Sequence, residues 1–256
     1  MLAVTLQQDP PAGESSYIHD ISITNLPIPK VEANHVLIKL QAASYNHRDE
    51  WIRQGLYPGI QVREKRWICQ ILLLRPNLAI TPQAGSILGS DGVGIVVNDD
   101  NQLTGQRVII YPSVGWEKDP RGPEGKFAIL GLLPLPGTFA EYIAVPSVDV
   151  FPTPAHLTNA EAAALPLAGL TAWRATFTKA QVKSGDHVLI TGIGKHLTGI
   201  TKSRILGISF NGGGVALAAL QFAVAAGANV YVTSSDESKI KRAIELGAKG
   251  GVNYKD

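Results

Sequence analysis

Hydrophobic and polar positions alternate in short segments along the first 150 residues. Residues 35–40 and 107–111 are examples, and Gly and Pro punctuate the chain between such segments. A period of two is typical of strands that bury one face. The pattern therefore predicts a β-rich, barrel-like half over residues 1–150.

The pattern changes after Pro152. Residues 157–178 are rich in Ala and Leu and indicate helical connections, with an N-cap at Thr158 or Asn159. The sequence then alternates between strand and helix patterns, which predicts an α/β fold with a doubly wound sheet. We expect strands at 187–191 and 229–233, the first buried on both faces, helices at 215–226 and 238–246, and the start of a third strand at 252–254.

Two stretches do not follow this pattern. Residues 62–83 combine a charged run with an apolar run and lack a period, and residues 195–212 separate Gly194 from Gly213. We interpret both as insertions, with unspliced intron sequence as the hypothesis. A genuine surface loop is the alternative for residues 62–83, because long loops cost little closure entropy.

Composition narrows the classes of function. The chain has 256 residues, of which 45% are hydrophobic and 17% charged, with a formal net charge of +2, so we expect one or two globular domains and no nucleic-acid partner. The start lacks a secretory signal pattern, and the apolar run at 68–74 is too short to span a bilayer. We therefore expect a cytoplasmic protein without a membrane partner. The single cysteine, Cys69, rules out an internal disulfide and any site needing two thiolates.

When the two stretches are set aside, several motifs resemble the medium-chain dehydrogenase/reductase superfamily. The resemblance is to its zinc-free quinone oxidoreductase-like and zinc-type alcohol dehydrogenase-like branches in particular. The motifs are Ala43-Ser44-Tyr45-Asn46-His47-Arg48-Asp49, Gly85 to Gly94, Gly137-Thr138-Phe139-Ala140-Glu141-Tyr142 and Leu165 to Trp173. The resemblance implies a GroES-like domain over 1–150 and a partial Rossmann domain over 151–256. It also implies that the substrate binds between the two domains and that a final segment of the family is missing here.

The resemblance also implies a nicotinamide cofactor. A pyrophosphate binds at the N-terminus of the first Rossmann helix, where bare backbone lets the phosphates approach. The predicted contacts to the cofactor lie in this turn, at the end of the second strand and at matching family positions: Thr171, Gly192, Gly194, Gly213, Gly214, Val215, Ser234, Ser235, Lys239 and Tyr254.

The end of the second strand decides between NADP and NAD. The hydroxyls of Ser234 and Ser235 and the nearby Lys239 suit a 2'-phosphate, so we expect NADP, with NAD less favoured. Asp236 is either a helix cap or the acidic reader that would favour NAD. Lys239 and Tyr254 have ordinary alternatives, as a solvated helix lysine and a strand-end aromatic.

No metal is expected. By resemblance, Asn46 stands where zinc alcohol dehydrogenases of the family place a cysteine ligand, and Ser90-Asp91 stand where they place a His-Glu pair. Four cysteines for a structural zinc are also lacking. His47 beside Asp49 is interpreted as a hydrogen-bonded structural residue or a wall of the substrate pocket.

The resemblance implies an NADPH-dependent oxidoreductase that passes hydride to a quinone or an α,β-unsaturated carbonyl, a small-molecule substrate. Asn46, Asp49, Arg53 and Tyr57 are the predicted catalytic residues. Arg53 is alternatively a salt-bridge partner of Asp49, and Tyr57 a cap on the barrel mouth. An alcohol dehydrogenase-like enzyme and a non-catalytic nucleotide-binding fragment are the other readings, and the full-length parent is a candidate homodimer.

Overall fold

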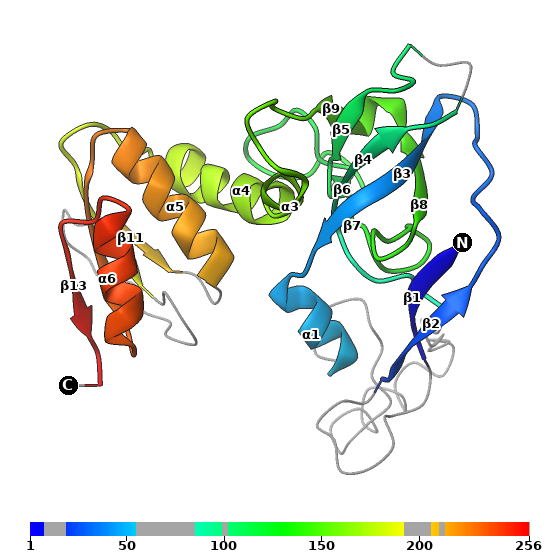
Figure 1. The fold of residues 1–256 in the computed structure, drawn as a ribbon. Helices are drawn as coiled ribbons and strands as arrows, with labels where there is room; N and C mark the ends of the chain where they lie inside the picture. Colours follow the sequence, from blue (N-terminus) through cyan, green and yellow to red (C-terminus); the bar gives the residue numbers. More distant parts are fainter. Residues whose placement is uncertain (8–18, 55–84, 99–101, 192–205, 210–212, 256) are drawn as a thin grey trace, which may run out of the picture. The chain divides into compact units, whose positions relative to one another are not determined.

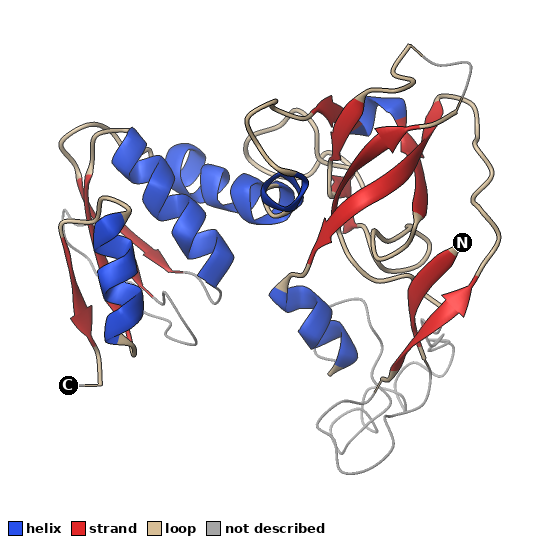
Figure 2. Ribbon diagram, viewed as in Figure 1, coloured by secondary structure: helices blue, strands red, loops and turns tan. Residues whose placement is uncertain are grey.

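The computed structural model describes residues 1–7, 19–54, 85–98, 102–191, 206–209 and 213–255. They form two compact units, Met1–Pro166 and Leu167–Asp256 (Figures 1 and 2). The sequence pattern placed this division after Val150. The boundary in the structure lies later, because the segment that follows Val150 still packs on the first unit. It does so through a further strand and a short helix.

The N-terminal unit is built on a five-stranded antiparallel sheet, which confirms the β-rich half. The strand order is β8-β3-β4-β5-β9. The bounds are β3 His35–Ser44, β4 Asp91–Val96, β5 Arg107–Ile110, β8 Tyr142–Pro146 and β9 Val150–Pro152. Two smaller pairs accompany it, β1 Leu2–Leu6 with β2 Ile21–Asn25 and β6 Ser113–Val114 with β7 Ala128–Ile129. The helix α1, His47–Arg53, follows β3 directly.

Alternation of side chains places the core of this unit. Val36 and Ile38 on β3 are fully buried and pack with Val108, Ile110 and Ile143 of neighbouring strands. A second cluster lies below α1, where Ile52, Leu6 and Leu88 meet. The end of β3 and the start of α1 are thus held between two apolar clusters.

The predicted helical stretch 157–178 is divided. It contains α3 Asn159–Ala163, α4 Pro166–Trp173 and the π-helix η2 Arg174–Lys179. Thr158 is the N-cap of α3, and its hydroxyl accepts from the backbone N–H of Glu161. The break before α4 coincides with Pro166, since a proline cannot donate a helical hydrogen bond and is favoured in a first turn.

The C-terminal unit is a parallel four-stranded sheet with two helices packed on it (Figure 1). The strand order is β11-β10-β12-β13. The strands are β10 His187–Thr191, β11 Leu206–Ser209, β12 Asn229–Ser234 and β13 Gly250–Asn253, and the helices are α5 Gly213–Ala225 and α6 Glu237–Glu245. This arrangement confirms the α/β fold and the two predicted strand-helix repeats.

The sheet of this unit buries one face more completely than the other. Val188, Ile190 and Val230 are fully buried under α5 and α6. On the other face Tyr231 is 38% and Val252 65% exposed. The expectation that residues 187–191 are buried on both faces was wrong, because among the described residues only one face of β10 is covered by helices.

A strand inside the stretch 195–212 is the main feature that the sequence pattern did not predict. Residues 206–209 form β11, which pairs in parallel with β10 from Val188↔Leu206 to Thr191↔Ser209. This edge of β10 lies opposite β12. In the order of a doubly wound sheet, it is the edge that the fourth strand takes. The interpretation of this stretch as an insertion stays a prediction, and residues 62–83 and the rest of 195–212 lie outside the described residues.

A glycine in the motif 137–142 generates a prediction for stability. A Cβ on Gly137 would collide with the backbone carbonyls of Ile87 and Leu88, whereas one on Gly122 would meet nothing within 4 Å. We expect Gly137→Ala to lower the free energy of unfolding by about 1–3 kcal/mol because backbone cannot move aside as a side chain can. Gly122→Ala, the matched control, should stay within about 0.5 kcal/mol in the same denaturant titration. Equal effects of both substitutions would contradict this account.

Candidate functional site

The first candidate site is the junction between β3 and α1. Asn46 has extended backbone (φ −121°, ψ 152°) and precedes the first helical residue. Its backbone N–H donates to Oδ2 of Asp49 at 2.8 Å. A carboxylate in the first helical turn that accepts from the cap residue is half of a capping box, which fixes where the helix begins.

The side chain of Asn46 reaches the start of β4. Its Nδ2 donates to Oδ2 of Asp91 at 2.9 Å and lies 3.4 Å from Oγ of Ser90. Ser90 and Asp91 are both fully buried. The structure therefore brings together the three residues that the resemblance places at the family's metal-ligand positions, and it joins them by hydrogen bonds.

Asp49 is a buried carboxylate, with its side chain 1% exposed. Burial raises its pKa, and the hydrogen bond from Asn46, the charge of Arg48 and the backbone of Gly89 partly oppose this. Its Oδ1 has no hydrogen bond within the described residues and lies 3.8 Å from Nη1 of Arg48. This enclosure favours a positioning role for Asp49 over direct contact with a substrate.

Arg48 belongs to the site and was not predicted from the sequence. It is 4% exposed, and its Nη1 donates to the backbone carbonyl of Leu130 at 2.8 Å. A buried guanidinium requires partners, because an isolated buried charge is costly. Arg48 thus links α1 to a distant loop. The one feature of the sequence that could have indicated its role is its position between two predicted site residues.

Arg53 lies in the last turn of α1, and its ion-pair partner differs from the one suggested by the sequence. Its Nη2 lies 3.8 Å from Oδ1 of Asp20, and its backbone carbonyl accepts from His19. Asp49 pairs with Arg48 instead, so the alternative that Arg53 pairs with Asp49 was wrong. Tyr57, the other predicted catalytic residue, lies outside the described residues.

His47 points away from the buried network. It is exposed, and its ring contacts Trp51 edge-on with centroids 4.8 Å apart. Among the described residues no group of three or more His, Cys, Asp or Glu side chains is arranged to hold a metal ion. The chemistry that the junction offers is therefore hydrogen bonding by an amide, a hydroxyl and a carboxyl group.

A second candidate site lies in the C-terminal unit, at the start of α5. Gly213 and Gly214 begin the helix with no positive φ, and a Cβ would meet nothing within 4 Å at Gly213 and only Cβ of Ala168, at 3.7 Å, at Gly214. Neither backbone conformation nor packing against the described part of the chain therefore requires glycine here. Bare backbone at a helix N-terminus suits the approach of a phosphate. Val215 follows in the first turn, half-buried, whereas Gly192 and Gly194 lie outside the described residues.

The end of β12 carries the other predicted cofactor residues. Ser234 is fully buried, and its Oγ accepts from the backbone N–H of Asp236 at 3.2 Å. Ser235 is half-buried and Lys239 is exposed. The backbone N–H of Tyr254 donates to the carbonyl of Ser234 at 3.0 Å. Three of these side chains are thus at least partly exposed near the end of β12: Ser235, Lys239 and Tyr254. The hydroxyl of Ser234 instead accepts a hydrogen bond within the turn.

Asp236 caps α6, as one of the two readings of the sequence suggested. Its Oδ1 accepts from the backbone N–H of Ser238 at 2.9 Å and from the hydroxyl of Ser238 at 2.7 Å. These hydrogen bonds, with the charge of Lys239, hold the pKa of Asp236 below its usual value. Thr171 is exposed on α4.

The buried acid at the junction generates a pH prediction. Because burial raises the pKa of Asp49 above 3.8, the folded state binds this proton more tightly than the unfolded state. The stability that Asp49 contributes is present in acid and lost as pH rises through the raised pKa. We therefore expect the melting temperature of the unaltered protein minus that of Asp49→Asn to fall as the pH rises above about 4.

Glu161→Gln is the comparison for this experiment. Hydrogen bonds from the backbone N–H and hydroxyl of Thr158 lower the pKa of Glu161, so its contribution is present above the usual pKa and lost in acid. The corresponding difference in melting temperature should rise with pH. A difference that also rises for Asp49→Asn would show that Asp49 is not held as described.

Comparisons with known proteins agree on one family. Residues 32–155 match the alcohol dehydrogenase GroES-like domain. The chain is 38% identical to the zinc-type alcohol dehydrogenase-like protein YogA of Leptosphaeria maculans in an alignment 256 positions long, which covers 95% of this chain and 60% of that protein. It is 26% identical to the quinone oxidoreductase of Mus musculus, covering 91% of this chain and 54% of that protein.

Solved structures give the same result. A crystal structure of an NAD-dependent alcohol dehydrogenase superposes with a TM-score of 0.72 and 30% identity, covering 100% of this chain and 64% of that one. The quinone oxidoreductase from Coxiella burnetii has a TM-score of 0.64 and 27% identity, covering 100% and 62%. The chain spans about 60% of the length of such relatives. With its GroES-like domain, its strand-helix repeats and the motif residues gathered at the β3–α1 junction, the chain belongs to the medium-chain dehydrogenase/reductase superfamily.

Proposed function

We propose that the protein is an NADPH-dependent oxidoreductase that reduces a quinone or an α,β-unsaturated carbonyl without a metal ion. The observation that carries this proposal is the hydrogen bond between Asn46 and Asp91, in the place where the resemblance puts the family's zinc ligands. An amide donor is a poor ligand for zinc, which is bound by thiolate, imidazole and carboxylate groups. When bound, the reduced nicotinamide supplies the hydride.

The residues of this chain would then bind, orient and polarise. Asn46 and Arg53 are proposed to contact the substrate or the nicotinamide, with Tyr57 beside them, and Thr171 to contact the nicotinamide. Asp49 acts through Asn46, whose backbone N–H it holds at 2.8 Å. Positioning is the main source of rate in such a reaction, since the hydride carrier does the chemistry.

NADP is proposed over NAD because of the surroundings of β12. Asp236 is engaged as the cap of α6, while Lys239 is exposed nearby. A cation there favours a 2'-phosphate, and Ser235 can donate a further hydrogen bond. Gly213 and Gly214 suit the diphosphate because they leave bare backbone at the start of α5, where a Cβ would meet little within 4 Å among the described residues.

A zinc-dependent alcohol dehydrogenase-like activity is the second candidate. It is favoured by the name of the relative at 38% identity. The third reading, a non-catalytic nucleotide-binding fragment, is favoured by the share of the relatives' length that the chain spans, about 60%. No helix in the described part of the chain is long and apolar enough to cross a bilayer. We also propose that the enzyme is cytoplasmic and acts on a small-molecule substrate. Its full-length parent is proposed to be a dimer.

Lys239→Ala tests the cofactor assignment. Loss of a hydrogen bond to a charged phosphate costs about 1.5–3 kcal/mol, so we expect the affinity for NADPH to fall about tenfold or more and that for NADH to change little. Lys241→Ala is the matched control, because Lys241 is an exposed lysine on the same helix. Calorimetric titration of both dinucleotides into the chain measures this. Equal losses for NADPH and NADH would contradict the choice of NADP, and no binding of either would contradict the proposed function.

Metal removal separates the first two candidate functions. We expect NADPH oxidation with quinones to persist after dialysis against a chelator, since no step of the proposed reaction uses a metal. Elemental analysis of the purified protein before dialysis should find no stoichiometric zinc. Activity that disappears with the metal and returns with zinc would favour the alcohol dehydrogenase-like reading.

A further inference from the structure

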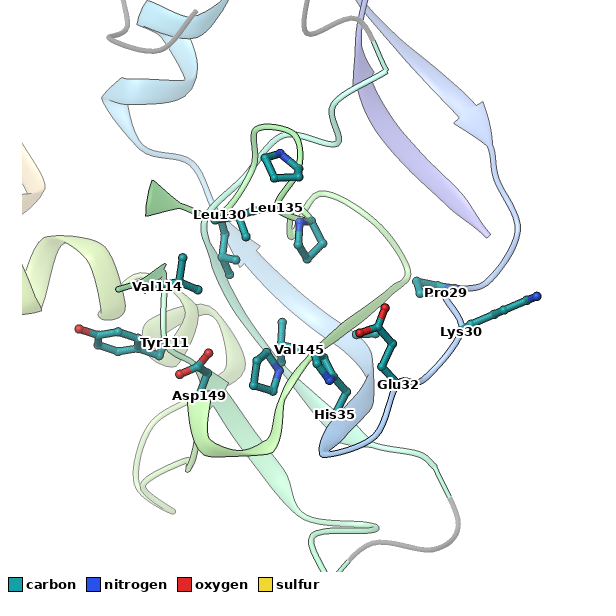
Figure 3. Close-up of a pocket in the computed structure, with 14 residues that line it drawn as sticks. Pro29, Lys30, Glu32, His35, Tyr111, Val114, Leu130, Leu135, Val145 and Asp149 are labelled. Carbon is teal, nitrogen blue, oxygen red and sulfur yellow. The ribbon is translucent and has the colours of Figure 1, made fainter. Parts of the chain in front are cut away.

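A cavity lies in the N-terminal unit, and none of the predicted site residues lines it. Its volume is about 360 Å³. Figure 3 shows its walls, which come from the chain before β3, the end of β8, and the loops that follow β5 and β7. A cavity of this size falls in the range of pockets that take small organic molecules.

The floor of the cavity is apolar. Leu130 is 3% and Val145 2% exposed, and both contribute to the wall together with Leu135. Pro134 and Pro136 add further rigid apolar surface. An apolar body placed here would be removed from water, which stabilises binding by about 25 cal/mol per Å² of apolar surface before the costs of association.

Two carboxylates stand at the edge of this apolar surface. Glu32 and Asp149 lie on different walls of the cavity in Figure 3, with His35 near Glu32. Neither carboxylate accepts a hydrogen bond from another described residue. His35, by contrast, places Nδ1 3.1 Å from the carbonyl of Ala33. Lys30 also lines the cavity, but in Figure 3 its side chain extends away from Asp149. The two carboxylates therefore leave acceptors available on the cavity wall.

The electrostatic setting of Asp149 is negative. Burial raises its pKa, the nearby charge of Glu117 raises it further, and His35 opposes them. A cationic group that entered the cavity would relieve the repulsion between Asp149 and Glu117. The Tyr111 ring also lines the wall, and its hydroxyl donates to the carbonyl of Trp116 at 3.0 Å. Aromatic faces attract cations, so Tyr111 adds to the same preference.

We infer that this cavity binds a small organic cation, a primary ammonium carried on an apolar body. The ammonium pairs with Asp149, with Glu32 as a second acceptor, and the body rests on Leu130 and Val145. An anion of the same shape is disfavoured by the two carboxylates. The inference does not rest on the proposed oxidoreductase function, because it uses none of the residues assigned to the substrate or the cofactor.

Three probes with one aromatic body and different head groups test the inference. They are 2-phenylethylamine, 2-phenylethanol and phenylacetate, titrated into the full chain at neutral pH with detection by calorimetry or by protein NMR. We expect the amine to bind about tenfold or more tightly than the alcohol, and phenylacetate not to bind, since a charged hydrogen bond contributes about 1.5–3 kcal/mol. Equal affinity for amine and alcohol, or no binding of the amine, would overturn the inference.

Substitutions locate the binding. Asp149→Asn should lower the affinity for the amine about tenfold and leave that for the alcohol unchanged. Glu237→Gln, which removes an exposed carboxylate on α6, is the charge-matched control and should change neither. Ala144→Leu fills the cavity from β8 and should weaken both probes. Unaltered melting temperatures establish that each variant is folded. Amine binding that survives both Asp149→Asn and Ala144→Leu would place it elsewhere and overturn the assignment.

Discussion

The hydrogen bond between the amide of Asn46 and the carboxyl group of Asp91 is the interaction on which the N-terminal site depends. It joins the beginning of α1 to the beginning of β4, two segments that are 45 residues apart in the chain. Asp49 fixes the backbone of the same asparagine, and Arg48 fixes the helix to Leu130. Four polar side chains are thus held in an otherwise apolar region, where each requires its partners.

This network supports the proposal that the junction works without a metal ion. A zinc site would require anionic or imidazole ligands arranged around an ion, and their mutual repulsion would be balanced by the metal charge. Here the amide donates to Asp91, and Arg48 lies beside Asp49, so the protein itself balances its buried acids. The names of relatives include both a zinc-type alcohol dehydrogenase-like protein and a quinone oxidoreductase.

Much of the fold followed from local pattern, and much of the site from motif. Alternation over residues 35–40 predicted a strand that buries one face, and in the structure Val36 and Ile38 form that face. The motifs placed Asn46 and Asp91 at related positions, and the structure joins them. The role of Arg48 could not be predicted, because its partner Leu130 is 82 residues away and offers only a backbone carbonyl. The strand β11 was also not predicted, because a short strand at the edge of a sheet depends on pairing with a neighbouring strand, which the local sequence does not specify. The exposure of Tyr231 likewise depends on which helices cover the sheet.

A double-mutant cycle between Asn46→Ala and Asp91→Ala tests the central claim most directly. The free energy of unfolding of the N-terminal unit is measured for the unaltered protein, both single variants and the double variant. If the amide and the carboxyl group hold each other, the two losses are not additive, and we expect a coupling energy of about 1.5 kcal/mol or more. Losses that add to within about 0.5 kcal/mol would contradict the account, because the two side chains would then be stabilised independently.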